Sequence, residues 1–466
     1  MTEPVSDVVV CVDVGSTYTK ALLVDIGTAA VVAIAQRPTF ATGDVLDAVE
    51  ACRAEVAAVD ARAADGGILA CSSAGGGLRV VVVGHEALVT AEAGRRVALS
   101  SGGKVVGVVA AAGQPTEVVS RLLAALVAPR PPQSPLVEGR VQRASEPPAQ
   151  GIDLVLLTGG TDGGNRAALV EAARAVAASG FEGPVVVAGN VDARDEVAGI
   201  LAGLPHVLAD NAVPRIGVLA PASARAAVRA QFLQHVIAGK GLTARGARLA
   251  QLVQGPTPDV VLAGVEVLAY GIDEERPGIG DVAVVDVGGA TTDVYSVVTL
   301  DAERSDDGLA HEVVAPTSAN RTVEADLGMR ESAGLPGSFV PTTDEEYAAD
   351  EEIARAAAAT AVRRHAGRSR IVLAPDGRVV ERSGVDLREV SLVIGSGGVL
   401  RHGRPGVAER VLGGLVTADD PEGWQLPERA RIVIDQQYVL MAVGLLAGQH
   451  PDVAYRLARS LATVAQ

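Results

Sequence analysis

Short apolar runs alternate along the chain with longer segments in which apolar residues recur every three or four positions. The apolar runs, such as Val8 to Val12 and Val282 to Val285, have the length of strands, and turns rich in Gly, Ser or Thr follow them. The longer segments have helical spacing, as in residues 44–64. Strands that alternate with helices of this length predict an α/β protein, and the β-α-β-α-β rhythm of residues 151–213 predicts a parallel sheet.

Two apolar runs end in an aspartate and continue through a tight turn into a second strand. Asp13 in the first corresponds to Asp286 in the second, and Gly15 corresponds to Gly288. Backbone N–H groups and hydroxyls of such a turn point at an anion, and the aspartate suits a hydrated Mg²⁺. We therefore expect two facing hairpins that clamp a polyphosphate from both sides. The two segments are VVVCVDVGSTYTKALLVD (8–25) and VAVVDVGGATTDVYSVV (282–298).

A third glycine-rich turn follows the short apolar strand at residues 392–394. Its glycines, Gly395, Gly397 and Gly398, would let a flat base or ribose lie against the backbone. The GxGxxG pattern fails because Leu400 stands where the third glycine belongs, which argues against a Rossmann site. Residues 100–105 also lack the leading glycine and the hydroxyl of a P-loop.

Composition narrows the class of protein. The 466 residues carry a net charge of −16, which argues against general binding to nucleic acid or anionic membranes. Hydrophobic residues make up 48% and aromatic residues only 2%, so Val, Ala and Leu must build the core. The three cysteines form no metal-ligand spacing, and no basic segment precedes the first apolar run. We expect a cytoplasmic protein without a membrane span.

The order of the motifs predicts how the chain is divided. We expect a first lobe over residues 1–280 and a second lobe over residues 281–466, with C-terminal helices able to return to the first. An α/β module is expected as an insertion at about 66–128. The Pro-rich segment 129–150 reads as a linker, because Pro blocks both ladder and helix hydrogen bonds.

The ordered hairpins and glycine turn resemble the ATPase fold shared by actin, sugar kinases and heat-shock chaperone ATPases. This resemblance implies two actin-like, ribonuclease H-like lobes around a nucleotide cleft. The chain further resembles the MutL family of glutamate mutase accessory proteins, which is distinct from the DNA mismatch-repair protein of the same name. The segments that carry this likeness are GGTDGGN (159–165), VAGN (187–190), VDVGGATTDVYSV (285–297), TVEADLGMR (322–330) and IDQQYVLMAVGLL (434–446).

The resemblance implies an ATP-binding, slowly ATP-hydrolysing accessory or reactivating protein for an adenosylcobalamin-dependent mutase. ATP and Mg²⁺ are the implied cofactors and the mutase is the implied partner, while the oligomeric state stays open and a dimer is compatible with it. Two alternatives remain at this point: a small-molecule kinase of the same fold, and a scaffold or filament protein regulated by nucleotide. The kinase would need a general base, for which Asp162 is the candidate.

Roles can be assigned to single residues on this basis. Asp13 and Asp286 are expected to face the metal and to act in catalysis. Glu266, or Asp259, is the candidate that orients the attacking water. The expected phosphate-binding residues are Gly15, Ser16, Thr17, Gly288, Gly289, Thr291 and Thr292, and Gly395, Gly397 and Gly398 are expected beneath the adenosine.

Several further residues have two readings. Lys20 either reaches a phosphate or is an exposed lysine of an edge strand. Glu324 and Asp326 contact ribose or metal, or form a carboxylate pair at a helix start. Asp162 and Asn165 in GGTDGGN suit an anion site at a helix N-terminus or a turn with a helix cap.

Overall fold

The computed structural model divides the chain into two compact units. The first contains the described residues up to Gly76 and those from Ile237 onward, and the second contains Gly77–Val236. The structure describes residues 7–127 except 42 and 88, residues 151–300 except 238–242 and 244, and residues 318–463 except 331, 332, 336–338, 375, 376 and 419.

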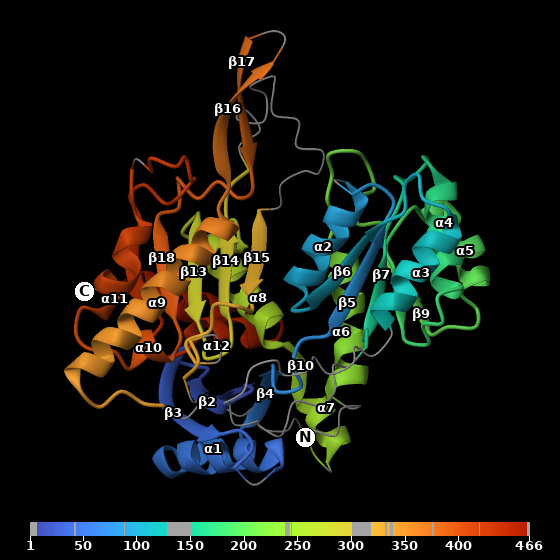
Figure 1. The fold of residues 1–466 in the computed structure, drawn as a ribbon. Coiled ribbons are helices and arrows are strands. Elements are labelled where there is room, and N and C mark those ends of the chain that lie inside the picture. Colours follow the sequence, from blue (N-terminus) through green and yellow to red (C-terminus); the bar gives the residue numbers. More distant parts are fainter. Residues whose placement is uncertain are drawn as a thin grey trace, which may run out of the picture. The chain divides into compact units, whose positions relative to one another are not determined.

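The first unit contains two five-stranded sheets with the same topology, in the orders β3-β2-β1-β4-β10 and β15-β14-β13-β18-β19 (Figure 1). In each sheet the central strand pairs antiparallel with the next strand of its hairpin and parallel with a later strand. This duplicated order is that of two actin-like, ribonuclease H-like lobes, so the predicted fold class is confirmed. The strands are β1 (Val8–Val14), β2 (Tyr18–Asp25), β3 (Ala30–Pro38), β4 (Gly67–Ser72), β10 (Val253–Pro256), β13 (Val282–Val287), β14 (Thr292–Val297), β15 (Ala319–Glu324), β18 (Leu392–Ser396) and β19 (Arg431–Ile434).

Alternate residues of the central strands supply two apolar cores. Val282 and Val284 of β13 enter a core with helices α8 (Thr257–Tyr270), α12 (Val439–Leu446) and α13 (Pro451–Thr463). This core also contains residues of β1 and β2, so both sheets share it, and the C-terminal helices pack against the first lobe. The intervening residues of β13 face helices α9 (Asp344–His365) and α11 (Val407–Leu412) in a second core.

Helices α8 and α12 approach each other closely through two glycines. A Cβ atom on Gly264 would lie 2.1 Å from the Leu440 carbonyl oxygen, and one on Gly444 would lie 1.9 Å from the Val260 carbonyl oxygen. Each glycine therefore faces the backbone of the other helix, where no larger residue fits. This contact fixes the relative position of the two helices that pack between the sheets.

The first unit contains further elements in addition to the strands and helices of the two cores. Helix α9 begins with a capping box between Thr343 and Glu346, and its ends carry acidic and basic residues that suit the helix dipole. Among the described residues, no helix is both long enough and apolar enough to cross a bilayer. The other elements are α1 (Val45–Val59), α7 (Gly246–Leu252), α10 (Gly398–Arg401), and the two-stranded pairs β11 (Gly271–Asp273) with β12 (Arg276–Pro277) and β16 (Arg368–Ala374) with β17 (Gly377–Ser383).

The second unit is a doubly wound parallel sheet in the order β6-β5-β7-β8-β9 (Figure 1). Its strands are nearly all apolar because helices cover both faces: α3, α4 and α5 share one core, while α2 packs against α6. The elements are β5 (Arg79–Gly84), α2 (Thr90–Ser100), β6 (Lys104–Ala110), α3 (Thr116–Val127), β7 (Leu154–Leu157), α4 (Arg166–Ala177), β8 (Val185–Val187), α5 (Arg194–Ile200), β9 (His206–Leu208) and α6 (Ala222–Phe232).

These units differ from the predicted boundaries of the insertion. The strand at the start of the predicted module, β4, pairs with β1 and belongs to the first lobe. The module instead includes β7, β8 and β9, so it runs over Gly77–Val236 rather than 66–128. The rhythm of strands and helices gave the elements, but it carries no information on which strands pair. The predicted Pro-rich linker at 129–150 lies outside the residues that the structure describes.

The glycine contact between α8 and α12 can be tested by adding a methyl group. We expect Gly444→Ala to lower the free energy of unfolding by about 1–3 kcal/mol, because the methyl forces the helices apart. Gly448→Ala is the matched control, since a Cβ there meets no atom within 4 Å. Urea unfolding of both variants measures the difference. Equal stability of Gly444→Ala and wild type would contradict the contact.

Candidate functional site

The two predicted hairpins have the same backbone register. Asp13 pairs with Lys20 across the first hairpin, and Asp286 pairs with Asp293 across the second. The turns close alike: the Gly15 amide donates to the Tyr18 carbonyl at 3.1 Å, and the Gly288 amide donates to the Thr291 carbonyl at 2.9 Å.

Both turn glycines are required by this closure. A Cβ on Gly15 would lie 2.6 Å from the carbonyl oxygen that its own amide contacts, and one on Gly288 would lie 2.9 Å from the corresponding oxygen. The backbone groups of Ser16 and Thr17, and of Gly289 in the second turn, lie at exposed positions. These are the groups that the sequence predicts for phosphate binding.

Asp13 is held in place from several sides. It is only 7% exposed, and the Thr257 hydroxyl at the start of α8 donates to its Oδ1 at 2.6 Å. The Lys20 ammonium lies 3.6 Å from its Oδ2. One oxygen therefore contacts a helix that packs between the sheets, and the other contacts a cation.

Asp286 occupies the corresponding position in the second sheet, where burial raises its pKa to about 6. Lys20 lowers this pKa, while the negative charges of Asp293 and Asp13 raise it further. The neighbouring Ser396 hydroxyl, at the end of β18, lowers this pKa as well. The two metal-facing aspartates predicted from the sequence thus belong to one cluster of interacting charges that includes Lys20.

Lys20 is not a solvated lysine of an edge strand. Its side chain is 22% exposed, and β2 lies between β1 and β3 in the sheet. Burial lowers its pKa, but the negative charges of Asp13 and Asp286 outweigh this effect, so the pKa is raised overall. A permanently charged ammonium between the two hairpins is suited to a phosphate group.

Two residues of this cluster were missed by the sequence predictions. The Tyr438 ring lies 4.1 Å from the Lys20 ammonium and 3.5 Å from the Arg401 guanidinium carbon, measured to the ring centroid. Tyr438 precedes α12 and lies in the matching segment IDQQYVLMAVGLL, while Arg401 ends α10, three residues after Gly398. A tyrosine that follows two glutamines gives no periodic signal, and a lone arginine after a helix turn gives none either.

Arg401 has one satisfied and one unsatisfied nitrogen. Its Nε donates to the Gln436 carbonyl at 2.8 Å, whereas its Nη1 is buried and has no hydrogen-bond partner among the described residues. A buried charged donor without an acceptor costs roughly 1–3 kcal/mol or more. Burial, and then the charges of Arg401 and Lys20, lower the pKa of the adjacent His402. This corner of the site is therefore positive.

The structure gives a different account of each of the three glycines that were predicted beneath the adenosine. A Cβ on Gly395 would lie 2.7 Å from side-chain carbons of Leu400 and Leu412, so this glycine allows packing. Gly397 has a φ of +105°, and its Cβ would lie 2.2 Å from the Val287 carbonyl oxygen. Gly398 has no atom within 4 Å of a Cβ, so its missing side chain leaves open space above the backbone. Only Gly398 keeps a vacant position for a ligand.

Thr291 and Thr292 are engaged within the second hairpin and the segment beside it. The Thr291 hydroxyl donates to Asp293 at 3.0 Å, and the buried Thr292 hydroxyl donates to the Leu327 carbonyl at 2.5 Å. The amides of Met329 and Arg330 contact the carbonyls of the hairpin turn. Thr292 therefore holds the turn in place rather than presenting its hydroxyl to a ligand.

Glu324 and Asp326 have a different partner from the predicted ribose or metal. Both carboxylates form ion pairs with Arg364 in the last turn of α9, at 2.5 and 2.8 Å. The side-chain bonds to Arg364 lower the pKa of Asp326. These residues fasten the end of β15 to α9, because an arginine distant in sequence lies opposite them.

Glu266 is not brought to the two aspartates. It lies nine residues beyond Thr257 on α8, which corresponds to about 13 Å along a helix. Its charge raises the pKa of Tyr270 at the far end of α8, after the larger effect of burial. The alternative, Asp259, is fully buried in the first turn of α8, next to the contact with Asp13.

The residues singled out in GGTDGGN belong to the second unit and support its loops. The Asp162 carboxylate accepts from the Val191 amide at 3.1 Å and from the Asn211 amide group at 2.8 Å. Asn165 is the N-cap of α4 and accepts from the Ala168 amide. These bonds favour the turn-and-cap reading over an anion site.

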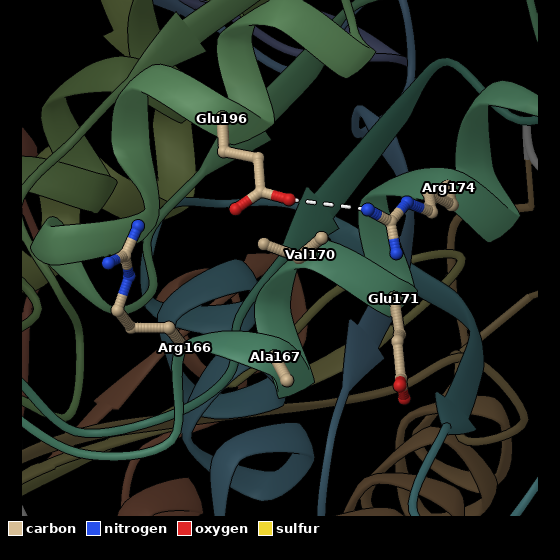
Figure 2. A pocket seen from close by; sticks show the side chains of 6 residues that line it. All are labelled: Arg166, Ala167, Val170, Glu171, Arg174 and Glu196. Atoms are coloured by element: carbon tan, nitrogen blue, oxygen red, sulfur yellow. Dashed lines mark hydrogen bonds and ion pairs between the residues drawn. The ribbon is translucent and has the colours of Figure 1, made fainter.

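A surface hollow of about 340 Å³ lies between α4 and α5 of the same unit (Figure 2). Figure 2 shows Glu196 and Arg174 facing each other across it, with their ion pair at 3.2 Å. The charges of its two arginines and two glutamates balance. None of the site residues predicted from the sequence lines this hollow. The lining residues are Arg166, Ala167, Val170, Glu171, Arg174 and Glu196.

The side chains of the two hairpins can be compared with the ligands that Mg²⁺ prefers in proteins. Within the described part of the chain, no group of three or more His, Cys, Asp or Glu side chains is arranged to hold a metal ion. Mg²⁺ is commonly bound through one or two carboxylates together with water and substrate phosphates. Asp13 and Asp286 fit that mode, in which the nucleotide itself completes the shell.

Solved structures share only a distant likeness with this chain. An acetone carboxylase in its nucleotide-free form is 13% identical, with 98% of this chain and 61% of that protein covered and a TM-score of 0.30. A gluconate kinase from Lactobacillus acidophilus is 10% identical, with 98% and 90% covered and a TM-score of 0.30. The ethanolamine utilization protein EutJ from Carboxydothermus hydrogenoformans is 10% identical, with 96% and 89% covered and a TM-score of 0.26. TM-scores this low do not establish a shared activity.

The sequence comparisons show a much closer relationship than the comparisons with solved structures do. A family model described as MutL protein matches residues 9–335 and 336–461. Protein MutL from Clostridium tetanomorphum is 33% identical over 488 residues, which cover 97% of this chain and 98% of that protein. The family model spans the two aspartate hairpins, the glycine turn after β18 and the Tyr438 segment. The chain therefore belongs to the MutL protein family.

Proposed function

We propose that this protein binds and slowly hydrolyses ATP, and that it uses ATP to reactivate an adenosylcobalamin-dependent mutase such as glutamate mutase. The observation that supports nucleotide binding most directly is the pair of matched hairpins, which brings Asp13, Lys20 and Asp286 into one cluster. Two carboxylates from separate sheets and a charged lysine suit a metal-bound polyphosphate.

Each part of the cluster has a task in this proposal. The exposed turn backbones at Ser16, Thr17 and Gly289 donate to phosphate oxygens, and Lys20 neutralises their charge. Asp13 and Asp286 would hold Mg²⁺ through water, and Mg²⁺ would stabilise the charge that develops on the transferred phosphoryl group. The open space at Gly398 accepts the adenosine.

The proposed action on a mutase rests on thermodynamic linkage between nucleotide binding and partner binding. If ATP and ADP favour different angles between the lobes, a partner that prefers one angle binds with different affinity in the two states. A differential of about 1–3 kcal/mol would change partner affinity roughly 5–150-fold. Family membership supports the choice of partner, and helices α8 and α12, which contact both sheets, support the coupling.

The kinase alternative is less well supported. It needs a free carboxylate as general base beside a substrate pocket. Its candidate, Asp162, already accepts two hydrogen bonds that hold loops of the second unit. We therefore favour hydrolysis coupled to a protein partner.

The role of Asp286 gives two expectations for Asp286→Asn. Hydrolysis should fall by about a hundredfold or more, because a metal-facing carboxylate is lost. Because the folded-state pKa is raised from 3.8 to about 6, the wild type loses stability as the pH rises through this window. Without ligands, the variant should therefore gain about 2–3 kcal/mol relative to wild type between pH 3.5 and pH 7.

ATP turnover and urea unfolding at several pH values measure both effects. Asp25→Asn is the control of opposite sign, because bonds to Thr28 and Arg62 lower the pKa of Asp25. That variant should be less stable than wild type at neutral pH and should converge with it in acid. Wild-type turnover in Asp286→Asn would contradict the metal assignment.

Gly398 tests the adenosine position better than its neighbours do. Gly398→Val should weaken ATP binding roughly tenfold or more without changing the unfolding temperature, because its side chain enters open space. Gly397→Val should instead unfold the turn, since its Cβ meets the Val287 backbone. Gly67→Val in β4, which also meets no atom, is the control. Unchanged ATP affinity in folded Gly398→Val would remove adenosine from this position.

The partner is tested by reactivation. A candidate adenosylcobalamin-dependent mutase is inactivated by turnover and then mixed with this protein and fresh cofactor. We expect activity to return with ATP but not with ADP or a non-hydrolysable analogue. Recovery that is absent, or equal under all three conditions, would rule out ATP-driven reactivation.

A further inference from the structure

The aromatic ring of Tyr438 contacts two cationic side chains beside the cluster of Asp13, Lys20 and Asp286. Lys20 comes from β2 of the first lobe and Arg401 from α10 of the second, yet both side chains contact this ring, at 4.1 and 3.5 Å from its centroid. Two cations at one ring attract its π face but repel each other.

The backbone at Tyr438 is in an uncommon conformation. Its φ of +55° and ψ of +35° lie in the left-handed region, which a bulky residue adopts at a cost. The following α12 is anchored independently, because the buried Asp435 carboxylate accepts from the amides of Val439 and Leu440 at 2.8 and 3.0 Å. The ring position is therefore imposed by its contacts and not needed to begin the helix.

Arg401 is incompletely satisfied in this arrangement. Its Nη1 is buried without a hydrogen-bond partner among the described residues, although its Nε is bonded to Gln436. An aromatic ring offers this guanidinium a π face but no acceptor for its remaining donors. A phosphate oxygen would supply such an acceptor, and bidentate arginine–phosphate contacts are stronger than a contact with a ring.

We propose that Lys20 and Arg401 form a cation pair for the phosphates of the nucleotide, and that the Tyr438 ring fills this pair in the ligand-free protein and is displaced by the ligand. This inference rests on the proposed ATP binding and adds an internal competitor to it. A phosphate and the ring cannot contact the same two cations at once. Ligand binding must therefore displace Tyr438, and the lost ring contacts lower the apparent affinity for the ligand. The start of α12 then reports whether the site is filled.

Fluorine NMR of protein labelled with fluorotyrosine observes the ring directly. The chain has six tyrosines, and the Tyr438 resonance is the one lost in Tyr438→Phe. We expect this resonance to shift on addition of Mg-ATP and also of inorganic triphosphate, which lacks the base. The control is the resonance of Tyr455 on α13, whose hydroxyl donates to the Pro277 carbonyl of β12.

Three variants test the competition by calorimetric titration with ATP. Tyr438→Asn removes the ring and tolerates the left-handed backbone, so it should bind ATP roughly tenfold more tightly. Arg401→Gln should bind roughly tenfold more weakly, because one phosphate-binding cation is lost. Arg368→Gln removes an arginine from a similar contact, with the Trp424 ring at 4.6 Å, and should leave the affinity unchanged.

The outcomes separate this inference from the proposed function. If ATP binds to wild type but the Tyr438 resonance does not move, ATP binding stands and the displacement is wrong. Equal ATP affinities of wild type, Tyr438→Asn and Arg401→Gln, each folded by circular dichroism, would also overturn it. If neither ATP nor triphosphate binds at all, both the inference and the proposed function fail.

Discussion

The charge of Lys20 between Asp13 and Asp286 is the interaction on which the rest of the site depends. Each aspartate ends the central strand of a different sheet, and their like charges oppose a close approach of the two hairpins. Burial adds to this cost, since desolvation is the largest reason for the raised pKa of Asp286. A cation at this position is thus a condition for the two sheets to share one core. A metal ion with nucleotide phosphates would meet the same condition in another way.

The sequence predicts the hairpins well because their chemistry is local. The distance from Asp to Gly along the chain sets which residues pair, and a turn that must close on its own carbonyl needs a glycine. The duplicated pattern therefore predicts both the fold class and the central charges. The identity of Lys20 as a site residue is not local, because its exposure depends on β3 and on a tyrosine more than four hundred residues away.

The remaining predictions fail or stay open for the same reason. Three glycines in one turn look alike in the sequence, but their neighbours, Leu400, Val287 and open space, come from the tertiary structure. Glu324 and Asp326 resemble ligand carboxylates until Arg364 of α9 is placed beside them. The extent of the insertion depends on strand pairing, which periodicity does not encode. Tertiary partners decide each of these cases.

The place at which the second unit enters the chain has a mechanical meaning. The chain leaves the first unit after β4 and re-enters it at Ile237, ahead of α7 and β10, and β4 and β10 are neighbouring strands. Beyond β4, the amides of Ser73 and Ala74 are bonded to the Val14 carbonyl, one residue after Asp13, while Thr257 directly after β10 is bonded to Asp13 itself. The outgoing segment and the helix that follows β10 are thus both bonded to the end of β1 that carries Asp13. A small shift of this strand end would therefore be passed both to the segment that leads into the second unit and to the start of α8.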